Sequence, residues 1–323
     1  MQKKTTIGLI GLGIIGTRVA ANLRRAGFSL VVWNRTPCSE PNFLASPAEI
    51  AAAADIIQIF VQDGKALLEV LQNLSPALTA RHVILNHATV HPRQTLEAAS
   101  LVERRGARFL DAPFTGSRDA AAEGKLVYFV GGLPDTLKEV RPILEVSSKE
   151  IVEVGPVGAA TYVKIANNIL IAAQVASLAE ALELLKLGRV PLDKLAETLQ
   201  HSAANSSTLA MKLPQMVGAD YEPRFSSKNM LKDLQFGLEI AKSYGTELPT
   251  AGAVVDILKR TVERGLGDAD FAALASEYSF PGTEQHFFTL NQSSGIAIDH
   301  SSSKQSSKKG FFSFLKIFEK EKK

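Results

Sequence analysis

The sequence predicts an α/β protein: a doubly wound, mostly parallel sheet followed by an all-α C-terminal domain. Over residues 5–154, short apolar runs alternate with helical stretches, which is the pattern of a parallel sheet covered on both faces. After residue 189 the strand signals stop and only helical stretches follow. Between the two halves, residues 155–189 form one nearly unbroken helix-forming stretch. We therefore expect two domains that are joined by a long interdomain helix.

The composition is that of a globular chain with two hydrophobic cores. The chain has 323 residues, 46% of them hydrophobic, and a domain takes about 150 residues. The single cysteine, Cys38, excludes a disulfide framework and a thiolate zinc site, so we expect no metal and a cytoplasmic location. The amino terminus has a basic start and an apolar run but no small-residue cleavage site, and we expect no secretion signal.

The net charge of +3 is unevenly distributed. Residues 304–323 carry seven lysines and two glutamates, a charge of +5, which leaves about −2 for the rest of the chain. The globular part has no basic excess, so we expect no nucleic-acid partner.

The elements of the first domain follow from local signals. Strands are expected at residues 5–10, 30–33, 56–61, 82–88, 108–112, 126–131 and 150–154, and helices at 17–26, 63–71, 92–105 and 135–144. A further short helix begins near Ser46, which is followed by a proline at the first helical position and by Glu49, a capping box.

The first strand leads directly into the motif G-x-G-x-x-G and then into a helix. Gly11 suits a tight turn, Gly13 lets the backbone approach a pyrophosphate, and Gly16 permits close helix packing. This strand–turn–helix context favours a Rossmann-type dinucleotide site over a plain glycine-rich turn. The expected cofactor contacts here are Gly11, Leu12, Gly13, Ile14, Ile15 and Gly16.

The residues after the second strand favour NADP(H) over NAD. An NAD-binding protein places an acidic residue there, whereas this chain has Asn34, Arg35 and Thr36. The arginine can pair with a 2′-phosphate, while the asparagine and threonine can donate hydrogen bonds. A solvated surface arginine is the alternative.

Two further loops follow the carboxyl ends of predicted strands, where ligands bind in such sheets. Val61, Gln62 and Thr89 are expected near the cofactor, or are ordinary loop residues. The run Thr115-Gly116-Ser117 offers hydroxyls and accessible backbone N–H groups, which suit a carboxylate, although by itself it is no more than a turn.

The long helix carries one polar patch on an apolar surface. Lys164 and Asn168 are four residues apart and therefore lie on the same helical face. Polar residues from Gln174 to Glu183 interrupt the apolar run before it reaches the length of a membrane span, so we expect a core or interdomain helix. A lysine that extends outward from a structural helix is the plain alternative.

The second domain is expected to be helical at residues 192–201, 208–217, 226–244, 250–264 and 270–278. Phe225, Lys232 and Asp233 stand out there, although a lysine and an aspartate on a helix usually form a solvated face. We expect domains at 1–155 and 156–282. Residues 283–323 form a Ser/Lys-rich linker and a basic amphipathic tail, which could contact a membrane or a protein weakly or be largely disordered.

Four stretches in this order resemble the β-hydroxyacid dehydrogenase family, which includes 3-hydroxyisobutyrate dehydrogenases and short semialdehyde reductases. They are GLGIIGTRVAANLRRAG at 11–27, DAPFTGSRDAAAEGKL at 111–126, GPVGAATYVKIANN at 155–168 and KDLQFGLEIAKSYG at 232–245. The resemblance implies that Lys164 is the catalytic lysine, that Asn168 binds substrate, and that residues 115–117 bind the substrate carboxylate. It also implies that Phe225 and Asp233 contact the substrate and that Lys232 contacts the cofactor.

The run Gly116-Ser117-Arg118 is similar to the Gly-Ser-Lys of the semialdehyde and glyoxylate reductases, and Asn34-Arg35-Thr36 is similar to NADP-using members. We therefore expect an NADPH-dependent reductase of glyoxylate, succinic semialdehyde or tartronate semialdehyde, assembled as a homodimer or homotetramer. Ile15, Ala88 and Thr115 depart from the family pattern and leave the substrate open. The alternatives are a 3-hydroxyisobutyrate-type NAD(P)-dependent dehydrogenase and a non-catalytic nucleotide-binding protein with a membrane- or partner-binding tail.

Overall fold

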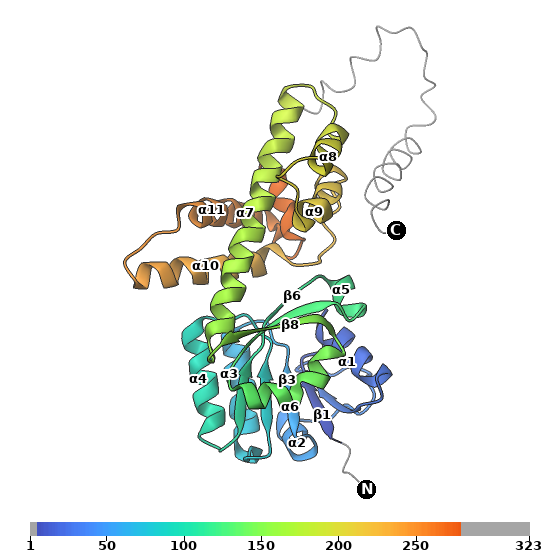
Figure 1. The fold of residues 1–323 in the computed structure, drawn as a ribbon, viewed down its shortest axis with the longest axis vertical. Helices are drawn as coiled ribbons and strands as arrows, with labels where there is room; N and C mark the ends of the chain where they lie inside the picture. Colours follow the sequence, from blue (N-terminus) through green and yellow to red (C-terminus); the bar gives the residue numbers. More distant parts are fainter. Residues whose placement is uncertain (1–4, 279–323) are drawn as a thin grey trace. The chain divides into compact units, whose positions relative to one another are not determined.

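The computed structural model describes residues 5–278, and the predicted linker and tail lie outside this range. The chain divides into two compact units, with the division between Asn167 and Asn168 (Figure 1). The first unit contains one eight-stranded sheet with helices, and the second contains helices. The expected fold class, a mostly parallel Rossmann-type sheet followed by a helical domain entered through a long helix, is confirmed.

The strands of the first unit pair in the order β2-β1-β3-β4-β5-β7-β6, and β8 pairs with β7. They are β1 (Thr6–Ile10), β2 (Ser29–Trp33), β3 (Ile56–Ile59), β4 (Val83–Asn86), β5 (Arg108–Asp111), β6 (Phe114–Thr115), β7 (Leu126–Gly131) and β8 (Ser148–Gly155). The first five of these strands pair with one another in parallel. Their carboxyl ends therefore meet at one edge of the sheet.

Helices cover both faces of this sheet because alternate strand residues point to opposite sides. The helices are α1 (Gly16–Arg25), α2 (Pro47–Ala53), α3 (Gly64–Leu74), α4 (Pro92–Glu103), α5 (Arg118–Ala122) and α6 (Pro134–Glu145), with a 3₁₀ turn η1 (Ser75–Ala77). Leu85 packs in the core under α1 and α6, while its neighbour Ile84 packs in the core under α2, α3 and α4. The strands are consequently apolar on both sides.

The capping box predicted at Ser46 is formed with a small change. The Ser46 hydroxyl accepts the N–H of Glu49 at 3.3 Å, as expected. The Glu49 carboxylate, however, accepts the N–H of Ala45 at 3.1 Å, one residue before the cap. Both ends of the motif still satisfy backbone donors that the helix itself cannot satisfy.

Two elements arise in the stretch that we expected to be a loop after β5. Phe114 and Thr115 form β6, which pairs with β7 in antiparallel fashion, and α5 follows immediately. β7 is also antiparallel to β5. Segments this short show no hydrophobic periodicity, so these elements were not predicted.

The second unit is built on α7 (Ala159–Leu187), whose first turns belong to the first unit. The predicted helix began at Gly155 and ended at Arg189, but residues 155–158 form a turn with positive φ at two glycines, and Arg189 itself has a φ of +56°. The other helices are α8 (Asp193–Gln200), α9 (Ser207–Val217), α10 (Ser227–Ser243), α11 (Pro249–Thr261), the π-helical turn η2 (Val262–Leu266) and η3 (Phe271–Tyr278), which is a 3₁₀ helix where an α-helix was expected.

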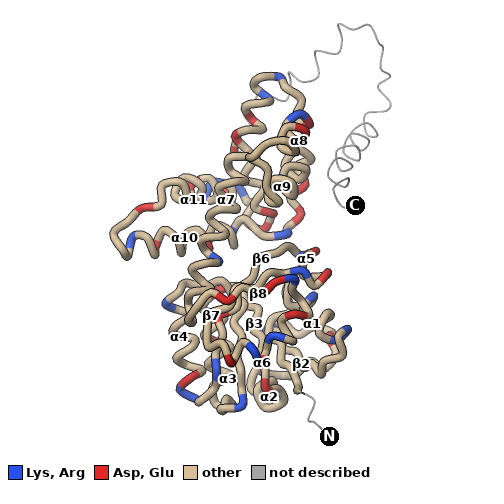
Figure 2. The backbone as a smooth tube through the Cα atoms, viewed as in Figure 1, with Lys and Arg blue, Asp and Glu red and all other residues tan. Residues whose placement is uncertain are grey.

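One face of α7 supplies the core of the second unit. Ala172, Val175, Leu178 and Leu182 pack there with residues of α8 to α11. α7 is long and apolar enough to cross a membrane by length and composition, although 44% of its most apolar window is buried inside the protein. The core helix of a soluble protein meets the same criteria. Cationic and anionic residues are interspersed around each unit (Figure 2).

Candidate active site

The turn between β1 and α1 contains three glycines that pack differently. Gly11 has a φ of +97°, and a Cβ atom there would lie 1.9 Å from the Phe60 carbonyl oxygen. A Cβ atom on Gly16 would lie 1.9 Å from the carbonyl oxygen of Gly11. Gly13 is exposed, and a Cβ atom there would meet nothing within 4 Å. Two glycines thus close the turn and the third leaves its outer side open, which fits a dinucleotide pyrophosphate.

Asn34 joins this turn to the end of β2. Its Oδ1 accepts the N–H of Leu12 at 3.1 Å, and its Nδ2 donates to the Thr36 carbonyl oxygen at 2.8 Å. These two hydrogen bonds hold the two loops together, and the cofactor contacts of Asn34 and Leu12 stay predictions. Arg35 and Thr36 are exposed. Arg35 is therefore an exposed cation next to Asn34, which is hydrogen-bonded to the glycine turn.

The remaining predicted cofactor residues lie at the same edge of the sheet. Ile14 is exposed at the glycine turn, while Ile15 packs against the first core. Val61 and the exposed Gln62 follow β3, and the half-buried Thr89 follows β4. The structure therefore places these residues beyond the carboxyl ends of the strands, where Rossmann-type sheets bind their ligands.

A buried histidine that the sequence analysis did not select lies beneath this edge. His87 Nδ1 is 2.7 Å from the Ala112 carbonyl oxygen and Nε2 is 3.0 Å from Gln58 Oε1. Burial lowers the pKa of His87 to about 4, so the ring is neutral at pH 7 and can donate from one nitrogen only. Gln58 Nε2 has no hydrogen-bond partner within residues 5–278. Exchanging the oxygen and nitrogen of the Gln58 amide places a donor opposite His87 Nε2, and we assign the amide that way.

This histidine also supports the loop after β3. The rings of His87 and Phe60 are stacked, with centroids 4.3 Å apart. Because Gln58, His87 and Ala112 belong to three adjacent strands or their ends, the hydrogen bonds fix the strand ends relative to one another. The sequence signal was a glutamine and a histidine within otherwise apolar strand segments, which rarely occur there without partners.

The run predicted to bind a carboxylate forms a compact corner. Thr115 ends β6, Gly116 has a φ of +137°, and the Ser117 hydroxyl accepts the N–H of Ala120 at 3.2 Å to cap α5. Asn167 Nδ2 donates to Thr115 Oγ1 at 3.5 Å. Asn167, which directly precedes Asn168, is not among the predicted site residues. Its contact brings the corner against α7.

Lys164 lies on the second turn of α7 and is 8% exposed. The start of the helix is held by Asp111, the last residue of β5. Asp111 Oδ2 accepts the N–H of Thr161 at 3.0 Å and its hydroxyl at 2.9 Å. Burial raises the pKa of Asp111 to about 6, against the opposing effect of hydrogen bonds from Thr161 and from the Gly158 amide. The carboxyl is therefore mostly ionised at pH 7.

In the second unit, Asn168 contacts Asp233 of α10, which in turn pairs with Lys232. Its Nδ2 donates to Asp233 Oδ2 at 2.7 Å, and Lys232 Nζ lies 3.2 Å from Asp233 Oδ1. Asn168 and Asp233 are both buried. The structure thus groups Asn168, Lys232 and Asp233 in the second unit, and groups Lys164 with the Thr115 corner through Asn167 in the first.

The backbone of Phe225, the last predicted site residue, is hydrogen-bonded to Asp270. Asp270 Oδ2 accepts the N–H groups of Arg224 and Phe225 at 3.0 and 3.1 Å. Asp270 Oδ1 in turn lies 2.5 Å from Lys212 Nζ, in a fully buried ion pair. The ring of Phe225 packs edge-on against Phe271, with centroids 6.3 Å apart. Both the backbone and the ring of Phe225 are therefore fixed by contacts within the second unit.

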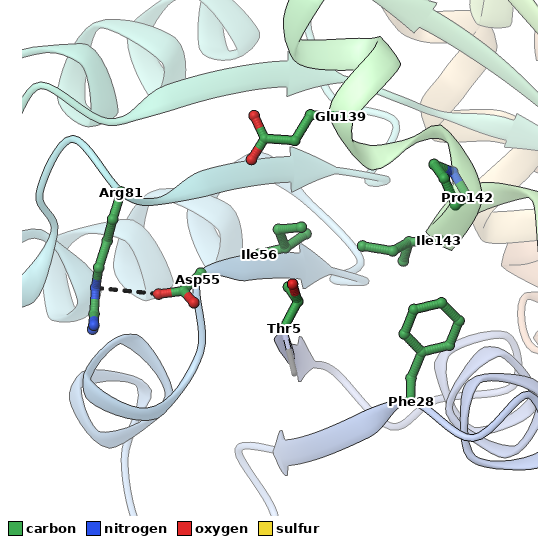
Figure 3. A pocket seen from close by; sticks show the side chains of 8 residues that line it. All are labelled: Thr5, Phe28, Asp55, Ile56, Arg81, Glu139, Pro142 and Ile143. Carbon is green, nitrogen blue, oxygen red and sulfur yellow. Dashed lines mark ion pairs between the residues drawn. The ribbon is translucent and has the colours of Figure 1, made fainter. Parts of the chain in front are cut away.

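A surface pocket of about 540 Å³ lies at the opposite edge of the sheet (Figure 3). Thr5, Phe28 and Asp55, which line it, each precede a strand and therefore mark the amino ends. Asp55 is paired with Arg81 at 3.4 Å. Residues 5–278 contain no cluster of three or more histidine, cysteine, aspartate or glutamate residues that could hold a metal ion. The candidate site is therefore the carboxyl edge.

Comparisons with known proteins identify both units. Residues 6–155 match the NAD binding domain of 6-phosphogluconate dehydrogenase, and residues 158–278 match the NAD-binding domain of NADP-dependent 3-hydroxyisobutyrate dehydrogenase. The chain is 28% identical over 279 residues to glyoxylate/succinic semialdehyde reductase 2, chloroplastic, of Arabidopsis thaliana, covering 83% of this chain and 78% of the relative. It is 30% identical over 278 residues to 2-hydroxy-3-oxopropionate reductase of Escherichia coli K12, covering 83% and 95%.

Among solved structures, 3-hydroxyisobutyrate dehydrogenase of Mycobacterium tuberculosis with L-serine superposes with a TM-score of 0.79 and 26% identity. The match covers 86% of this chain and 100% of that one. Family models thus match both units, and the curated relatives cover most of the chain. The chain is therefore a member of the 3-hydroxyisobutyrate dehydrogenase, or β-hydroxyacid dehydrogenase, family: an NAD(P)-dependent oxidoreductase that acts on the CH–OH group of small hydroxyacids or on the corresponding oxo acids.

Proposed function

We propose that this protein is an NADPH-dependent reductase of short semialdehyde or 2-oxo acids, with glyoxylate, succinic semialdehyde and tartronate semialdehyde as the candidate substrates. The observation that carries the proposal is Lys164, a buried cation one helical turn before Asn168 on α7. Two relatives of this chain are reductases of such compounds by name. Gly116-Ser117-Arg118 and Asn34-Arg35-Thr36 also favour the reductases.

In the proposed reaction the nicotinamide of NADPH supplies a hydride to the carbonyl carbon. The Lys164 ammonium donates a proton to the oxygen, so that the carbonyl becomes a CH–OH group. A lysine with an ordinary pKa near 10.4 is protonated at neutral pH and is already the acid that reduction requires. The backbone and hydroxyl groups of the Thr115 corner hold the substrate carboxylate, and Asn168 orients the substrate beside Lys164.

For the cofactor we propose a preference for NADPH. No acidic side chain occupies residues 34–36, and Arg35 is exposed next to an asparagine that is bonded to the glycine turn. A guanidinium pairs in bidentate fashion with a phosphate, whereas the ribose hydroxyl of NAD offers it no charge. The strength of this preference rests on Arg35.

For the assembly we propose a homodimer that forms through α7. Leu170, Leu184 and Leu187 are 65%, 69% and 63% exposed on this helix. Such large apolar side chains in one row are typical of a surface that another protein covers. A second copy of the chain is the partner with the same row.

The decisive experiment is an assay of NADPH oxidation with glyoxylate, succinic semialdehyde, tartronate semialdehyde and methylmalonate semialdehyde. The reverse reaction is measured with 3-hydroxyisobutyrate and glycolate, using NADP and NAD. We expect the highest kcat/KM for one of the first three compounds with NADPH. A higher kcat/KM for 3-hydroxyisobutyrate oxidation would instead support a dehydrogenase, which is the second candidate that the M. tuberculosis structure favours.

A further inference from the structure

α7 begins without a capping side chain of its own. The residue before the helix is Gly158, whose φ is +92° and which has no side chain to accept the orphan N–H groups of the first turn. The N–H of Ala159 reaches the carbonyl oxygen of Pro156 at 3.0 Å. The N–H of Thr161 is accepted by Asp111, fifty residues earlier in the chain. The cap of this helix is therefore supplied by the end of β5.

The same segment of α7 is held at a second point. Asp111 is bonded to Thr161, one turn before Lys164, and the Thr115 hydroxyl accepts from Asn167, one turn after it. Asp111 and Thr115 are only four residues apart, at the end of β5 and in β6. Residues 111–115 thus form hydrogen bonds with α7 on both sides of Lys164, and this segment continues into Gly116 and Ser117.

The polarity of the network at the first point is fixed by chemistry. An ionised carboxylate only accepts hydrogen bonds, so the Thr161 hydroxyl must donate its single proton to Asp111. Thr95 Oγ1, on α4, lies 3.0 Å from Thr161 Oγ1 and must therefore be the donor to it. All three side chains are fully buried. Of these three side chains, only the Asp111 carboxylate accepts both the N–H and the hydroxyl of Thr161.

We propose that Asp111 is a positioning residue for the reaction: by capping α7 across the fold, it holds Lys164 in register with the Thr115 corner. This rests on the proposed function, in which Lys164 donates the proton and the corner binds the substrate carboxylate. Asp111 contacts neither the substrate nor the reacting atoms in this scheme. It fixes the distance between two groups that must both engage a molecule of two to four carbon atoms.

The test compares Asp111→Asn with Thr95→Val. Asparagine keeps the shape and one acceptor but removes the charge at the positive end of a long helix. Displacement of a catalytic group by about 1 Å costs on the order of a hundredfold in rate. For Asp111→Asn we expect kcat for the best oxo acid to fall by roughly tenfold to a hundredfold, with the Kd for NADPH within about threefold of wild type. Thr95→Val, which loses a contact to the same threonine without uncapping the helix, should keep kcat within about threefold.

A double-mutant cycle shows whether Asp111 acts through Lys164. If it does, Lys164→Ala with Asp111→Asn should have the same kcat as Lys164→Ala alone, because a misplaced lysine and an absent one are equivalent. If Asp111→Asn lowered kcat by the same factor in the wild type and in Lys164→Ala, the proposal would be overturned. If Asp111→Asn does not fold, Thr161→Val, which keeps the N–H bond and loses the hydroxyl, gives the same cycle with a smaller effect.

The outcomes also separate this inference from the proposed function. A large loss in Lys164→Ala, combined with wild-type kcat in Asp111→Asn, would leave the reductase intact and reject the positioning role. A wild-type rate in Lys164→Ala would reject the proposed proton donor itself, and with it the reason for positioning that lysine.

Discussion

Asp111 and His87 are buried ionisable residues at the ends of neighbouring strands, and their pKa values move in opposite directions. Burial raises the pKa of Asp111 from 3.8 to about 6 and lowers the pKa of His87 from 6.5 to about 4. Burial disfavours the charged form in both cases, which is the anion for aspartate and the cation for histidine. Each shift corresponds to about 3 kcal/mol of free energy of unfolding.

These shifts predict opposite effects of acid on stability. Folded Asp111 binds its proton more tightly than the unfolded chain does, so its ionisation costs stability above pH 6, and this cost disappears as the pH falls towards 4. Folded His87 resists protonation, so its contribution is present above pH 6.5 and is lost as the pH falls towards 4. Relative to wild type, Asp111→Asn should lose about 3 kcal/mol between pH 7 and 4, and His87→Gln should gain a similar amount. Urea unfolding at both pH values measures this, and parallel profiles for the three proteins would contradict it.

Lys164 is the residue on which the proposed chemistry depends most. Lys164→Ala should lower kcat by roughly a hundredfold to ten-thousandfold, since it removes the proton donor, while the Kd for NADPH stays within about threefold. Stopped-flow measurement of NADPH oxidation at saturating oxo acid gives the rate. The matched control is Lys65→Ala, which removes an 87% exposed lysine at the start of α3. A rate within threefold of wild type for Lys164→Ala would reject the assignment.

Arg35 should decide the choice of cofactor. Replacing it with alanine removes a charge-assisted pair with the 2′-phosphate, which contributes about 1.5 to 3 kcal/mol. We expect kcat/KM with NADPH to fall by roughly tenfold to a hundredfold while kcat/KM with NADH is unchanged. Arg25→Ala, an exposed arginine in the last turn of α1, is the control. Equal changes with both cofactors would show that Arg35 does not read the phosphate.

At the scale of elements, the glycine turn contains one glycine that the fold requires, Gly16, and one that cofactor binding requires, Gly13. A side chain at Gly16 collides with the backbone of Gly11, whereas a side chain at Gly13 meets open space. Gly16→Ala should therefore destabilise the protein by about 3 kcal/mol or more. Gly13→Ala should keep the melting temperature and weaken NADPH binding at least about tenfold, since its methyl group occupies the space for the pyrophosphate. Thermal melts and NADPH fluorescence titrations measure the two effects, and equal binding by Gly13→Ala and wild type would contradict the assignment.

Most elements could be predicted because their signals are local. Proline and serine at the start of α2, the apolar runs of β1 to β5 and the glycines after α1 and α4 each act through neighbouring residues. The residues that failed prediction depend on distant partners. β6 is too short for periodicity and exists because β7 pairs with it. Asp111 reads as one polar residue at a strand end until Thr161 is placed against it.

The same distinction applies to the candidate site. The glycine motif and the Lys164–Asn168 spacing follow from local geometry, so they were accessible from the sequence. The amide of Asn34 was predicted as a donor to the cofactor, and its hydrogen bond with Leu12 could not be predicted, because it depends on the folded position of the glycine turn. His87 and Gln58 were hidden among apolar residues, because a buried polar pair is recognised only when both members are in place.

At the scale of the whole molecule, α7 carries a row of residues that are exposed, apart from the half-buried Ala173. The row follows a repeat of three and four residues: Val163, Ala166, Leu170, Ala173, Ser177, Glu180, Leu184 and Leu187. This is the spacing of a coiled-coil seam, and we propose that it packs against the same row of a second copy. In an antiparallel pair related by a twofold axis at Ser177, Leu170 would face Leu184 of the partner copy, and the small residues in the middle would let the helices approach closely. Leu170 and Leu184 thus pair symmetrically, as a twofold interface requires.

The double substitution Leu170→Glu with Leu184→Glu tests this assembly. Each glutamate would place a charge opposite another where two leucines meet, one heptad from the axis, so we expect the mass measured by light scattering to fall from a dimer or tetramer to a monomer, with the helical circular dichroism unchanged. Leu133→Glu is the matched control, because Leu133 is 68% exposed in the first unit, outside the row. Loss of the oligomer in the control as well, or a wild-type protein that is monomeric at micromolar concentration, would contradict the proposed interface. Because Lys164 lies on the same helix, a monomeric variant with normal kcat would further show that each chain carries a complete site.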